Sequence, residues 1–430
     1  MTAVRVTLLA STAVCVAAPL SIAGDWPQWR GPDHNGVSRE SPNWPSGWPP
    51  RKLWSTNVGA GCSSPIIADG KVIAMGWAGE RGKGGEQGTD TVYCLDGQTG
   101  RLVWKQSYPA RYQGRLRAGD TSAYGGPLAT PSFDAATGYI YTLGVDGQLA
   151  CWAGRNGGRR IWARALHDDF KIAQRPNLGK GLRDYGFTCS PLICGGLLIV
   201  QVGDAGGTIV AFDKRTGEKR WSSEYRGAAG HCGGIVPVTA DSIGAVAVLT
   251  LTDLVLMRVE DGKTLSTRAW QTDFACNLPT PAVDGKRVVL TSGYNQSAAA
   301  LVDLAGGKPG PLWRSRTHAV VASPVVAGGR LFLVNDLLQC VDMADAKLLW
   351  KGGRFGHGSC IATADDKLLV FGNGRLALVD AKAGQYQQLA SVENLVKGTC
   401  YPQVAFSMGL IVCKDMNGDL VCLSVQGEGK

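Results

Sequence analysis

The sequence AFDKRTGEKRW, residues 211–221, combines an apolar run, a Thr-Gly turn and a closing tryptophan, and related segments recur along the chain. Repeats of about 40–50 residues with one aromatic marker each are typical of β-propellers, which have roughly four strands per blade. Here seven tryptophans close short β-type runs at intervals of 50, 58, 59, 49, 43 and 37 residues, namely Trp54, Trp104, Trp162, Trp221, Trp270, Trp313 and Trp350. The spacing therefore predicts an all-β propeller.

Each repeat also has an opening marker at the start of its first strand. The marker recurs at Pro65, Pro131, Pro191, Gly234, Pro281, Pro324, Ile361 and Gln403. Short apolar runs separated by glycine-containing turns follow the markers, a pattern that predicts an antiparallel meander. Eight markers predict a single eight-bladed propeller of four-stranded antiparallel blades.

The two ends of the repeat array complement each other. The last repeat runs through residues 410–413 and 420–423 and stops without a tryptophan-bearing outer strand. The run RKLW, residues 51–54, reads as an outer strand with no preceding blade. We therefore expect this N-terminal strand to complete the eighth blade and close the ring.

Two motifs resemble those of a known family. Segment 211–221 resembles the tryptophan-docking motif of pyrroloquinoline-quinone-type propellers; segment 94–104 matches it with Cys in place of Ala, and segment 340–350 matches weakly. The sequence DWPQWRGP at 25–32, followed by GVS at 36–38, is similar to the opening of secreted quinone-repeat-like propellers of planctomycete-type bacteria. The resemblance implies that the seven tryptophans pack between blades and that Asp96 and Asp213 shape the tight turns.

The N-terminal residues predict export. Residues 1–23 contain one positive charge, Arg5, then a short apolar stretch that ends in small residues, as a secretory signal peptide does. The expected organisation is a signal peptide at 1–23, an irregular N-terminal segment at 24–49 and the propeller at 50–430. No later segment reaches about 18 consecutive apolar residues, so we predict no transmembrane segment and a periplasmic or secreted monomer.

The positive charge of the chain is concentrated in two connections. The chain has 44 Lys and Arg against 35 Asp and Glu, for a formal net charge of +9. The two connections that follow Trp104 and Trp162 should emerge on one face, and they contain Arg111, Arg115, Arg117, Lys171, Arg175, Lys180 and Arg183. Such a face would attract an anionic envelope component or an acidic protein; the alternative is solvated charge on long loops. Export argues against a nucleic-acid partner.

The cysteines fall into two sets. Cys94, Cys151, Cys340 and Cys422 occupy one equivalent position in four blades, where a free buried thiol acts as a small apolar residue. A second set precedes or lies close to the opening markers and should gather near the channel: Cys62, Cys189, Cys232, Cys276, Cys360 and Cys400. Three of these thiolates could hold Zn²⁺ or Cu(I), two could form a disulfide, or all could fill a crowded axis as small residues.

The sequence lacks the expected ligands of a quinoprotein dehydrogenase. Such enzymes hold the quinone with two adjacent cysteines, an acid and amide set for calcium, and a catalytic aspartate. This chain has no adjacent cysteine pair and no Cys-x-x-Cys-His haem motif. Asp204, Asn277, Asp336 and Asn373 lie in plausible loops, although such residues are common in turns. We therefore predict no cofactor and no catalytic residue.

The chain also resembles the outer-membrane assembly propeller BamB in blade number, in repeat type and in the absence of cofactor ligands. That family works as a platform for partner proteins. The sequence thus favours an exported, non-catalytic scaffold that binds a protein or an anionic envelope component through one loop face. A dehydrogenase dependent on pyrroloquinoline quinone and calcium is the alternative.

Overall fold

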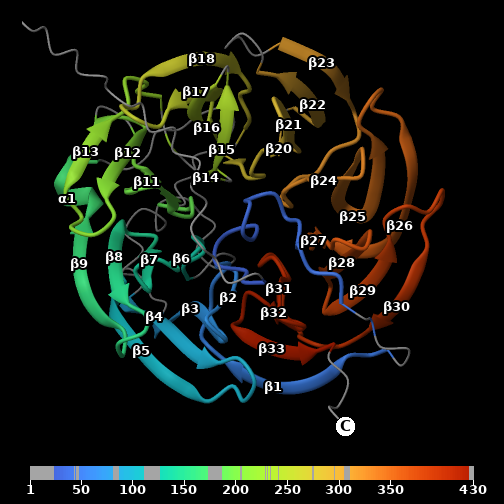
Figure 1. The fold of residues 1–430 in the computed structure, drawn as a ribbon, viewed down its shortest axis with the longest axis horizontal. Coiled ribbons are helices and arrows are strands. Elements are labelled where there is room, and N and C mark those ends of the chain that lie inside the picture. Colours follow the sequence, from blue (N-terminus) through green and yellow to red (C-terminus); the bar gives the residue numbers. More distant parts are fainter. Residues whose placement is uncertain are drawn as a thin grey trace, which may run out of the picture.

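The strands form eight blades around a common axis in the computed structural model (Figure 1). The structure describes residues 24–42, 44, 48–80, 87–110, 126–172, 186–203, 206–227, 229, 231–232, 234–240, 242–273, 276–294, 296–304 and 310–425. Every blade is an antiparallel meander whose first strand is innermost and whose last strand is outermost. The predicted eight-bladed propeller is confirmed.

The first four blades follow the chain in order. Blade 1 contains β2 (Ile66–Ala68), β3 (Lys71–Glu80), β4 (Gln87–Asp96) and β5 (Leu102–Ala110). Blade 2 contains β6 (Ser132–Asp134), β7 (Tyr139–Leu143), β8 (Gln148–Ala153) and β9 (Arg159–Ala165), after which comes the short helix α1 (Leu166–Phe170). Blade 3 contains β10 (Leu192–Cys194), β11 (Leu197–Gln201), β12 (Ile209–Asp213) and β13 (Lys219–Ser222). Blade 4 contains β15 (Ile235–Ala240), β16 (Ile243–Leu249), β17 (Asp253–Arg258) and β18 (Thr264–Ala269).

The remaining blades complete the ring. Blade 5 contains β20 (Ala282–Asp284), β21 (Arg287–Ser292), β22 (Ala298–Asp303) and β23 (Gly310–Ser315). Blade 6 contains β24 (Val325–Ala327), β25 (Arg330–Asp342) and β26 (Leu348–Gly356); the two halves of β25 pair with different neighbours, so it fills both middle positions. Blade 7 contains β27 (Ser359–Ala362), β28 (Lys367–Gly372), β29 (Arg375–Asp380) and β30 (Gln388–Val392). A separate parallel pair joins β14 (His231–Cys232) to β19 (Cys276–Asn277).

Blade 8 combines both ends of the repeat array. It contains β31 (Ala405–Ser407), β32 (Leu410–Lys414), β33 (Asp419–Ser424) and, as its outer strand, β1 (Arg51–Asn57). β1 pairs antiparallel with β33 from Arg51↔Ser424 to Asn57↔Asp419. The predicted closure of the ring by the N-terminal strand is therefore confirmed.

A chain of hydrogen bonds links neighbouring blades where their inner strands begin. In each link, a backbone N–H at the opening of one blade donates to a side-chain hydroxyl at the opening of the next blade. The described links are Gln403 to Ser64 (2.8 Å), Ser64 to Thr130 (3.2 Å), Thr130 to Ser190 (2.9 Å) and Thr280 to Ser323 (2.9 Å). The Ser or Thr that precedes proline in several opening markers thus satisfies a buried donor of the preceding blade.

The outer-strand indoles make a second set of links. Six of the seven predicted docking tryptophans donate Nε1–H to a carbonyl in the turn before the outer strand of the next blade, at 2.8–3.1 Å. The pairs are Trp54 with Gly97, Trp104 with Gly154, Trp162 with Lys214, Trp221 with Val259, Trp313 with Met343 and Trp350 with Ala383. Apolar residues of adjoining blades fill the space between them, as where Ile73 packs in one cluster with Ile140.

Trp270 lies outside this arrangement. It follows β18, and the register position equivalent to the docking tryptophans is Ser266, opposite Leu256. The Nε1–H of Trp270 has no hydrogen-bond partner among the described residues, and the guanidinium of Arg314 lies 5.0 Å from its ring centroid.

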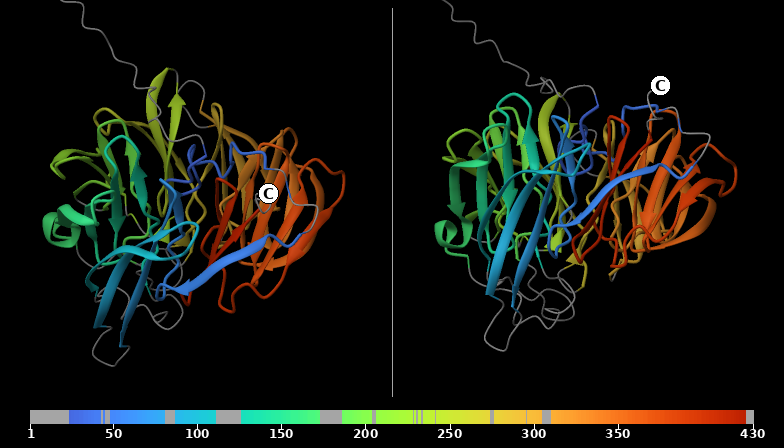
Figure 2. Two further views of the ribbon diagram at one scale, coloured as in Figure 1. Left: turned by 60° about the horizontal axis from the view of Figure 1, so that its bottom comes forward. Right: turned by 90° about the horizontal axis from the view of Figure 1, so that it is seen from below.

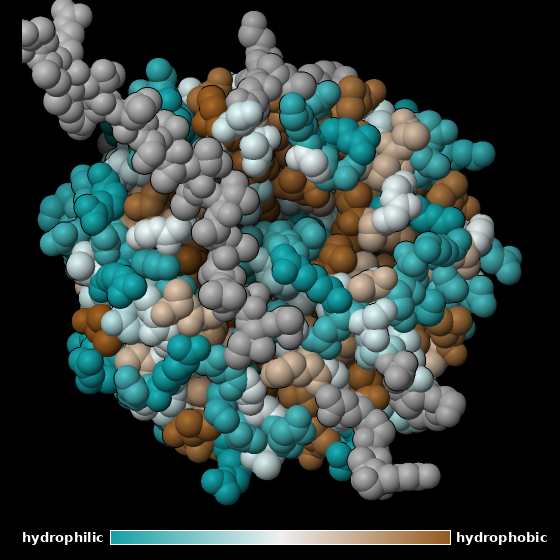
Figure 3. Space-filling model, in the orientation of Figure 1, coloured by the Kyte–Doolittle hydropathy of each residue, from teal (hydrophilic) through white to brown (hydrophobic). Residues whose placement is uncertain are grey.

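The two faces of the ring differ. We call the face with the turns between first and second strands and between third and fourth strands the turn face. The opposite face, with the hairpins between second and third strands and the connections between blades, is the loop face. The long strands β3, β4 and β5 extend on the loop face, opposite the N-terminal segment (Figure 2). In the axial view, hydrophilic residues stand along much of the outer edge of the ring (Figure 3).

Only one short helix, α1, is present in the described ranges, and none there is long and apolar enough to cross a membrane.

Candidate functional site

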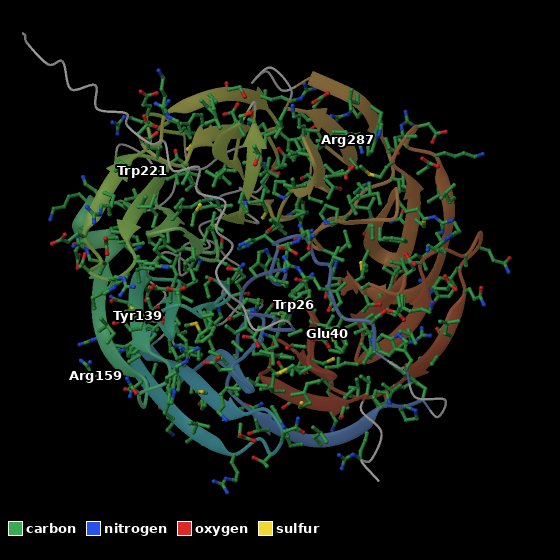
Figure 4. All side chains as sticks on the ribbon, viewed as in Figure 1. Trp26, Glu40, Tyr139, Arg159, Trp221 and Arg287 are labelled. Carbon is green, nitrogen blue, oxygen red and sulfur yellow. The ribbon has the colours of Figure 1, made fainter. Side chains whose placement is uncertain are left out.

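Residues 24–40, which we call the hub segment, enter the centre of the ring from the turn face. Trp26 is buried and pairs with Ile67 of the inner strand β2 through two backbone hydrogen bonds of 2.8 and 3.0 Å. The next residue, Pro27, accepts a backbone hydrogen bond from Phe133 of blade 2 at 2.8 Å. The segment therefore begins as an addition to the inner edges of blades 1 and 2, with Trp26 near the ring axis (Figure 4).

Arg30 crosses to the opposite side of the hub. Its side chain is fully buried, with a relative exposure of 0%. Nη1 donates to the carbonyls of Thr280 (3.0 Å) and Pro281 (3.2 Å) in blade 5. Nη2 donates to the carbonyl of Pro324 in blade 6 and, within the segment, to Asn35 O at 2.9 Å. One guanidinium thus satisfies four carbonyl oxygens, two of which belong to the proline opening markers.

The segment then returns to the turn face along blades 7 and 8. Ser38 N donates to Ala362 O (2.8 Å), and Ala362 N donates to Gly36 O (2.9 Å). The carboxylate of Glu40 accepts from the backbone N–H groups of Met408 (2.6 Å) and Gly409 (3.2 Å), in a turn of blade 8. The hub segment therefore bonds directly to blades 1, 2, 5, 6, 7 and 8, which is possible only because it lies on the axis.

The local sequence explains the sharp bend at the centre. Arg30 and Gly31 both have positive φ angles, 64° and 79°. A Cβ atom on Gly31 would lie 2.7 Å from the Trp26 ring, so only glycine fits at this position. Gly36 N then donates to Arg30 O (2.9 Å) and closes the loop. Trp26, Arg30 and Gly31 of the motif DWPQWRGP therefore form one packed unit.

The electrostatics of the hub are dominated by the buried guanidinium. Burial lowers the pKa of Arg30 to about 10, so it remains charged at neutral pH. Burial, together with the nearby Arg30 charge, lowers the pKa of His34 to about 4 and keeps that imidazole neutral. Burial raises the pKa of the Cys360 thiol to about 12. Among the described residues, the side-chain hydrogen bonds of Arg30 go to four carbonyl oxygens.

This hub does not fit a quinone site in the residues that the structure describes. The resemblance implies acidic and amide side chains that bind calcium beside the quinone. In this chain, the guanidinium of Arg30, held by backbone carbonyls, occupies the axis. Asn277 is buried and donates to the carbonyls of Thr250 (2.6 Å) and Trp270 (3.0 Å). Asp336 is ion-paired with the exposed Arg354 at 2.5 Å. Asp204 lies outside the described residues.

The thiols of the second set have separate surroundings. Gly374 N donates to Cys400 Sγ at 3.2 Å, Cys360 lies beside Arg30, and Cys62 lies near the buried Lys414. Cys189 and Cys276 are buried, and the side chain of Cys232 lies outside the described residues. Within the described ranges, no three His, Cys, Asp or Glu side chains lie close enough together to hold a metal ion.

The two predicted turn aspartates cap their turns. Asp96 Oδ1 accepts from the backbone N–H groups of Gln98 (3.2 Å) and Thr99 (3.1 Å). Its other oxygen accepts from Lys71 Nζ at 2.9 Å, and this hydrogen bond is the largest cause that lowers the pKa of Asp96 to about 2. Asp213 caps its turn in the same way, with Arg220 at 2.6 Å.

The predicted basic face is described only in part. Lys171 is exposed and ends α1 with a positive φ of 55°. The other six predicted residues lie outside the described residues: Arg111, Arg115, Arg117, Arg175, Lys180 and Arg183. Trp77 anchors the hairpin β3–β4 on this face, because it is buried, forms two backbone hydrogen bonds with Ala60 (2.8 and 2.9 Å) and donates Nε1–H to Ala110 O at 3.3 Å.

Sequence reasoning missed the central role of Arg30 and Glu40. Their partners in the blades lie between 250 and 369 positions away along the chain, so no local pattern predicts these contacts. The signal that could have drawn attention to them is the motif DWPQWRGP itself, which places an arginine between two tryptophans and a glycine in a segment without strand periodicity.

Comparison with known proteins agrees with this architecture. The family described as outer membrane protein assembly factor BamB matches residues 88–352 and 254–399. Quinohemoprotein alcohol dehydrogenase ADH-IIG of Pseudomonas putida is 25% identical over 163 residues, which are 37% of this chain and 19% of that enzyme. The chain thus matches about a fifth of the length of that curated relative.

Two solved structures illustrate the likeness. BamB from Moraxella catarrhalis superposes with a TM-score of 0.59 at 13% identity, over 87% of this chain and 100% of that chain. Quinohemoprotein alcohol dehydrogenase from Comamonas testosteroni superposes with a TM-score of 0.64 at 12% identity, over 98% of this chain and 83% of that chain. At these identities the likeness concerns the fold.

Proposed function

Because the chain belongs to the family of the outer membrane protein assembly factor BamB, a family of quinone-repeat-like propellers, we propose that it is an exported scaffold that binds a partner protein through its loop face. The proposal includes a signal peptide at 1–23, an irregular segment at 24–49, a propeller at 50–430 and a periplasmic or secreted location. The partner is a protein of the cell envelope.

The filled hub is the observation that carries this proposal. In a propeller, the axis is the natural place for a small ligand or cofactor. Here the hub segment bonds to six of the eight blades and places a fully buried arginine at the centre. Recognition is therefore left to the outer surfaces, which suits a scaffold.

The loop face supports the choice of surface. Among the described residues, this face includes the long hairpin β3–β4, which pairs continuously from Lys71↔Asp96 to Glu80↔Gln87. Trp77 fixes the base of this hairpin against Ala60 and Ala110. The exposed Lys171 follows α1 on the same face, where the sequence also predicts the arginine-rich connections to emerge.

Site-specific photo-crosslinking in the native envelope tests this proposal. A crosslinking amino acid at Gln87 or Lys171, on the loop face, should trap one discrete partner protein. The same amino acid at the exposed Lys286, on the turn face of blade 5, serves as the matched control and should trap none. Equal trapping from both faces, or trapping from Lys286 alone, would contradict a loop-face scaffold.

Charge reversal then tests the role of the basic residues. Replacing Arg115, Arg117, Lys171 and Arg175 by Glu should weaken recovery of the trapped partner. The control replaces the same number of exposed basic residues on the turn face, Arg215, Lys263, Lys286 and Lys347, and should leave recovery unchanged. Unchanged recovery in the first variant would remove the basic loops from the proposal.

The alternative is a quinone-dependent dehydrogenase, because two of the similar proteins are quinohemoprotein alcohol dehydrogenases. The described hub residues do not provide its ligand set. Adding pyrroloquinoline quinone and Ca²⁺ to the purified protein should leave its absorption spectrum and dye-linked alcohol oxidation at background. Saturable quinone binding with turnover would favour the dehydrogenase over the scaffold.

A further inference from the structure

The outer strands of the ring carry charge of one sign. These strands are β1, β5, β9, β13, β18, β23, β26 and β30, and none of them contains Asp or Glu. Together they contain twelve basic residues: Arg51, Lys52, Lys105, Arg159, Arg160, Arg164, Lys219, Arg220, Arg268, Arg314, Lys351 and Arg354. The whole chain has 44 basic and 35 acidic residues, so this one-sided distribution is a property of the rim.

Six of these residues form a continuous arc. They are exposed, make no ion pair with any residue of the described ranges, and belong to the outer strands of the consecutive blades 8, 1, 2 and 3. We call them the basic arc: Arg51, Lys52, Lys105, Arg159, Arg160 and Lys219. Figure 1 shows β1, β5, β9 and β13 in succession along the rim, and Figure 4 places Arg159 at the outer edge.

Two acidic residues in the turns beside the arc are ion-paired with basic residues outside it, and the exposed Glu218, next to Lys219, is a third acidic neighbour. Asp96, in the turn before β5, accepts a hydrogen bond from Lys71 at 2.9 Å. Asp213, in the turn before β13, pairs with Arg220 at 2.6 Å. The positive charge of the arc is therefore not cancelled by Asp96 or Asp213, and it faces solvent.

Protection of the edge strands does not account for this pattern. Charged side chains on an edge strand prevent unwanted pairing with other sheets. Lysine is the residue most used for that purpose, whereas eight of the twelve basic residues on these strands are arginines. A rim with basic residues alone is expected to attract anions in addition to preventing aggregation.

We propose that the basic arc binds a flexible, linear, carboxylated polysaccharide that follows the rim across blades 8, 1, 2 and 3. The shape of the arc favours this class of partner. A flat lipid surface touches a convex rim over one or two blades and leaves the rest of the arc without contact. A flexible chain can bend along all four outer strands and meet their charges in turn.

Nucleic acids fit the arc less well. Duplex DNA has a persistence length of about 50 nm, so it cannot follow a ring whose radius of gyration is roughly 20 Å for a compact chain of this length without a large bending cost. Single strands bind proteins largely by stacking bases on exposed aromatic rings. The exposed large hydrophobic residues in the described ranges are all aliphatic, and include Leu102 and Val103 on β5. Binding at the arc must therefore be electrostatic.

The experiment measures binding of polygalacturonate to the full exported chain by isothermal titration over a range of salt concentrations. The rim variant is Lys52→Glu, Lys105→Glu and Arg160→Glu, one change in each of three consecutive blades. The control is Lys286→Glu, Arg316→Glu and Lys397→Glu, which changes the net charge equally at exposed positions outside the outer strands.

The proposal predicts three results. Long fragments bind more tightly than short fragments that reach a single blade. The rim variant loses about tenfold or more in affinity at low salt. Its slope of log K against log salt also becomes shallower by about 2, because each charged contact with a single-stranded polyanion contributes about 0.7 to the slope and three contacts are removed. The control variant binds as the wild type does, and all three proteins keep the same thermal midpoint within about 2 °C.

Other results would overturn the proposal. Equal losses in both variants would mean that net charge, and not the arc, binds the polymer. Tighter binding to anionic vesicles or to single-stranded DNA than to polygalacturonate would assign the arc to those partners. The loop-face crosslinks should persist in the rim variant, because the arc and the loop face are separate surfaces.

Discussion

Replacing Arg30 by Ala tests the hub most sharply. The change removes a fully buried side chain whose guanidinium donates to the carbonyls of Thr280, Pro281, Pro324 and Asn35. Hydrogen bonds to a charged group contribute about 1.5–3 kcal/mol each, but the burial of an unneutralised charge offsets a large part of that total. The carbonyls left without a donor and the empty volume add to the loss, so we expect a net destabilisation of about 4 kcal/mol.

Differential scanning calorimetry provides the assay. For a chain of this length, a loss of about 4 kcal/mol corresponds to a fall of about 4–5 °C in the thermal midpoint. Arg39→Ala is the matched control, because it removes an arginine from the same segment. The Arg39 side chain is 62% exposed and forms a surface ion pair with Asp33, so its loss should cost less than about 1 kcal/mol.

The comparison of the two variants is decisive. If Arg30→Ala unfolds at the same temperature as Arg39→Ala, the hub segment does not support the ring, and the reasoning from its hydrogen bonds is wrong. Arg30→Lys adds a further check, since an ammonium cannot serve all four carbonyls at once. It should fall between the wild type and Arg30→Ala.

Three further predictions concern packing, polar satisfaction and pH. Gly157 and Gly158 have nearly equal φ angles of 65° and 68°, but a Cβ on Gly158 would lie 2.4 Å from a docking indole, whereas a Cβ on Gly157 meets nothing within 4 Å. Gly157→Ala should therefore cost about 1 kcal/mol in urea denaturation and Gly158→Ala about 3 kcal/mol or more; equal costs would contradict indole docking. Ser190→Ala leaves the buried backbone N–H of Thr130, in the neighbouring blade, without its acceptor and should cost about 1–3 kcal/mol. An unchanged urea midpoint would show that the hydrogen bonds between blades do not contribute to stability. Burial raises the pKa of the Asp25 carboxyl from 3.8 to about 6, so its contribution to stability is present below pH 4 and is lost as pH rises through 6. This loss is worth up to about 3 kcal/mol. In urea titrations across this pH range, Asp25→Asn should lack the loss, and a pH profile parallel to that of the wild type would refute the assignment.

The repeat could be predicted from the sequence because its signals are local. A docking tryptophan, its turn and its opening proline lie within one repeat, and each has a physical role that the residue type reveals. The indole of Trp104, for example, finds its acceptor in the equivalent turn of the next blade, as the regular geometry of a ring requires. The pairing of β1 with β33 could be predicted in the same way, because the last repeat lacks an outer strand and residues 51–54 form one without a preceding blade.

Spacing alone does not distinguish Trp270, which lies four positions beyond the docking register and is packed against Arg314. The hub was beyond prediction for a different reason. Arg30 and Glu40 bond to residues far along the chain through an irregular backbone, and neither periodicity nor turn chemistry encodes such contacts. The basic arc was missed because its members are distributed singly or in pairs over four repeats and gather only when the outer strands line up on the rim.

Hydrogen–deuterium exchange of the hub segment tests the central claim most directly. Peptides that cover residues 26–38 should exchange as slowly as those from the inner strands β2 and β27, because their backbone hydrogen bonds join those strands at the axis. Complete exchange of these peptides within seconds, while the inner strands stay protected, would show that the segment does not fill the hub.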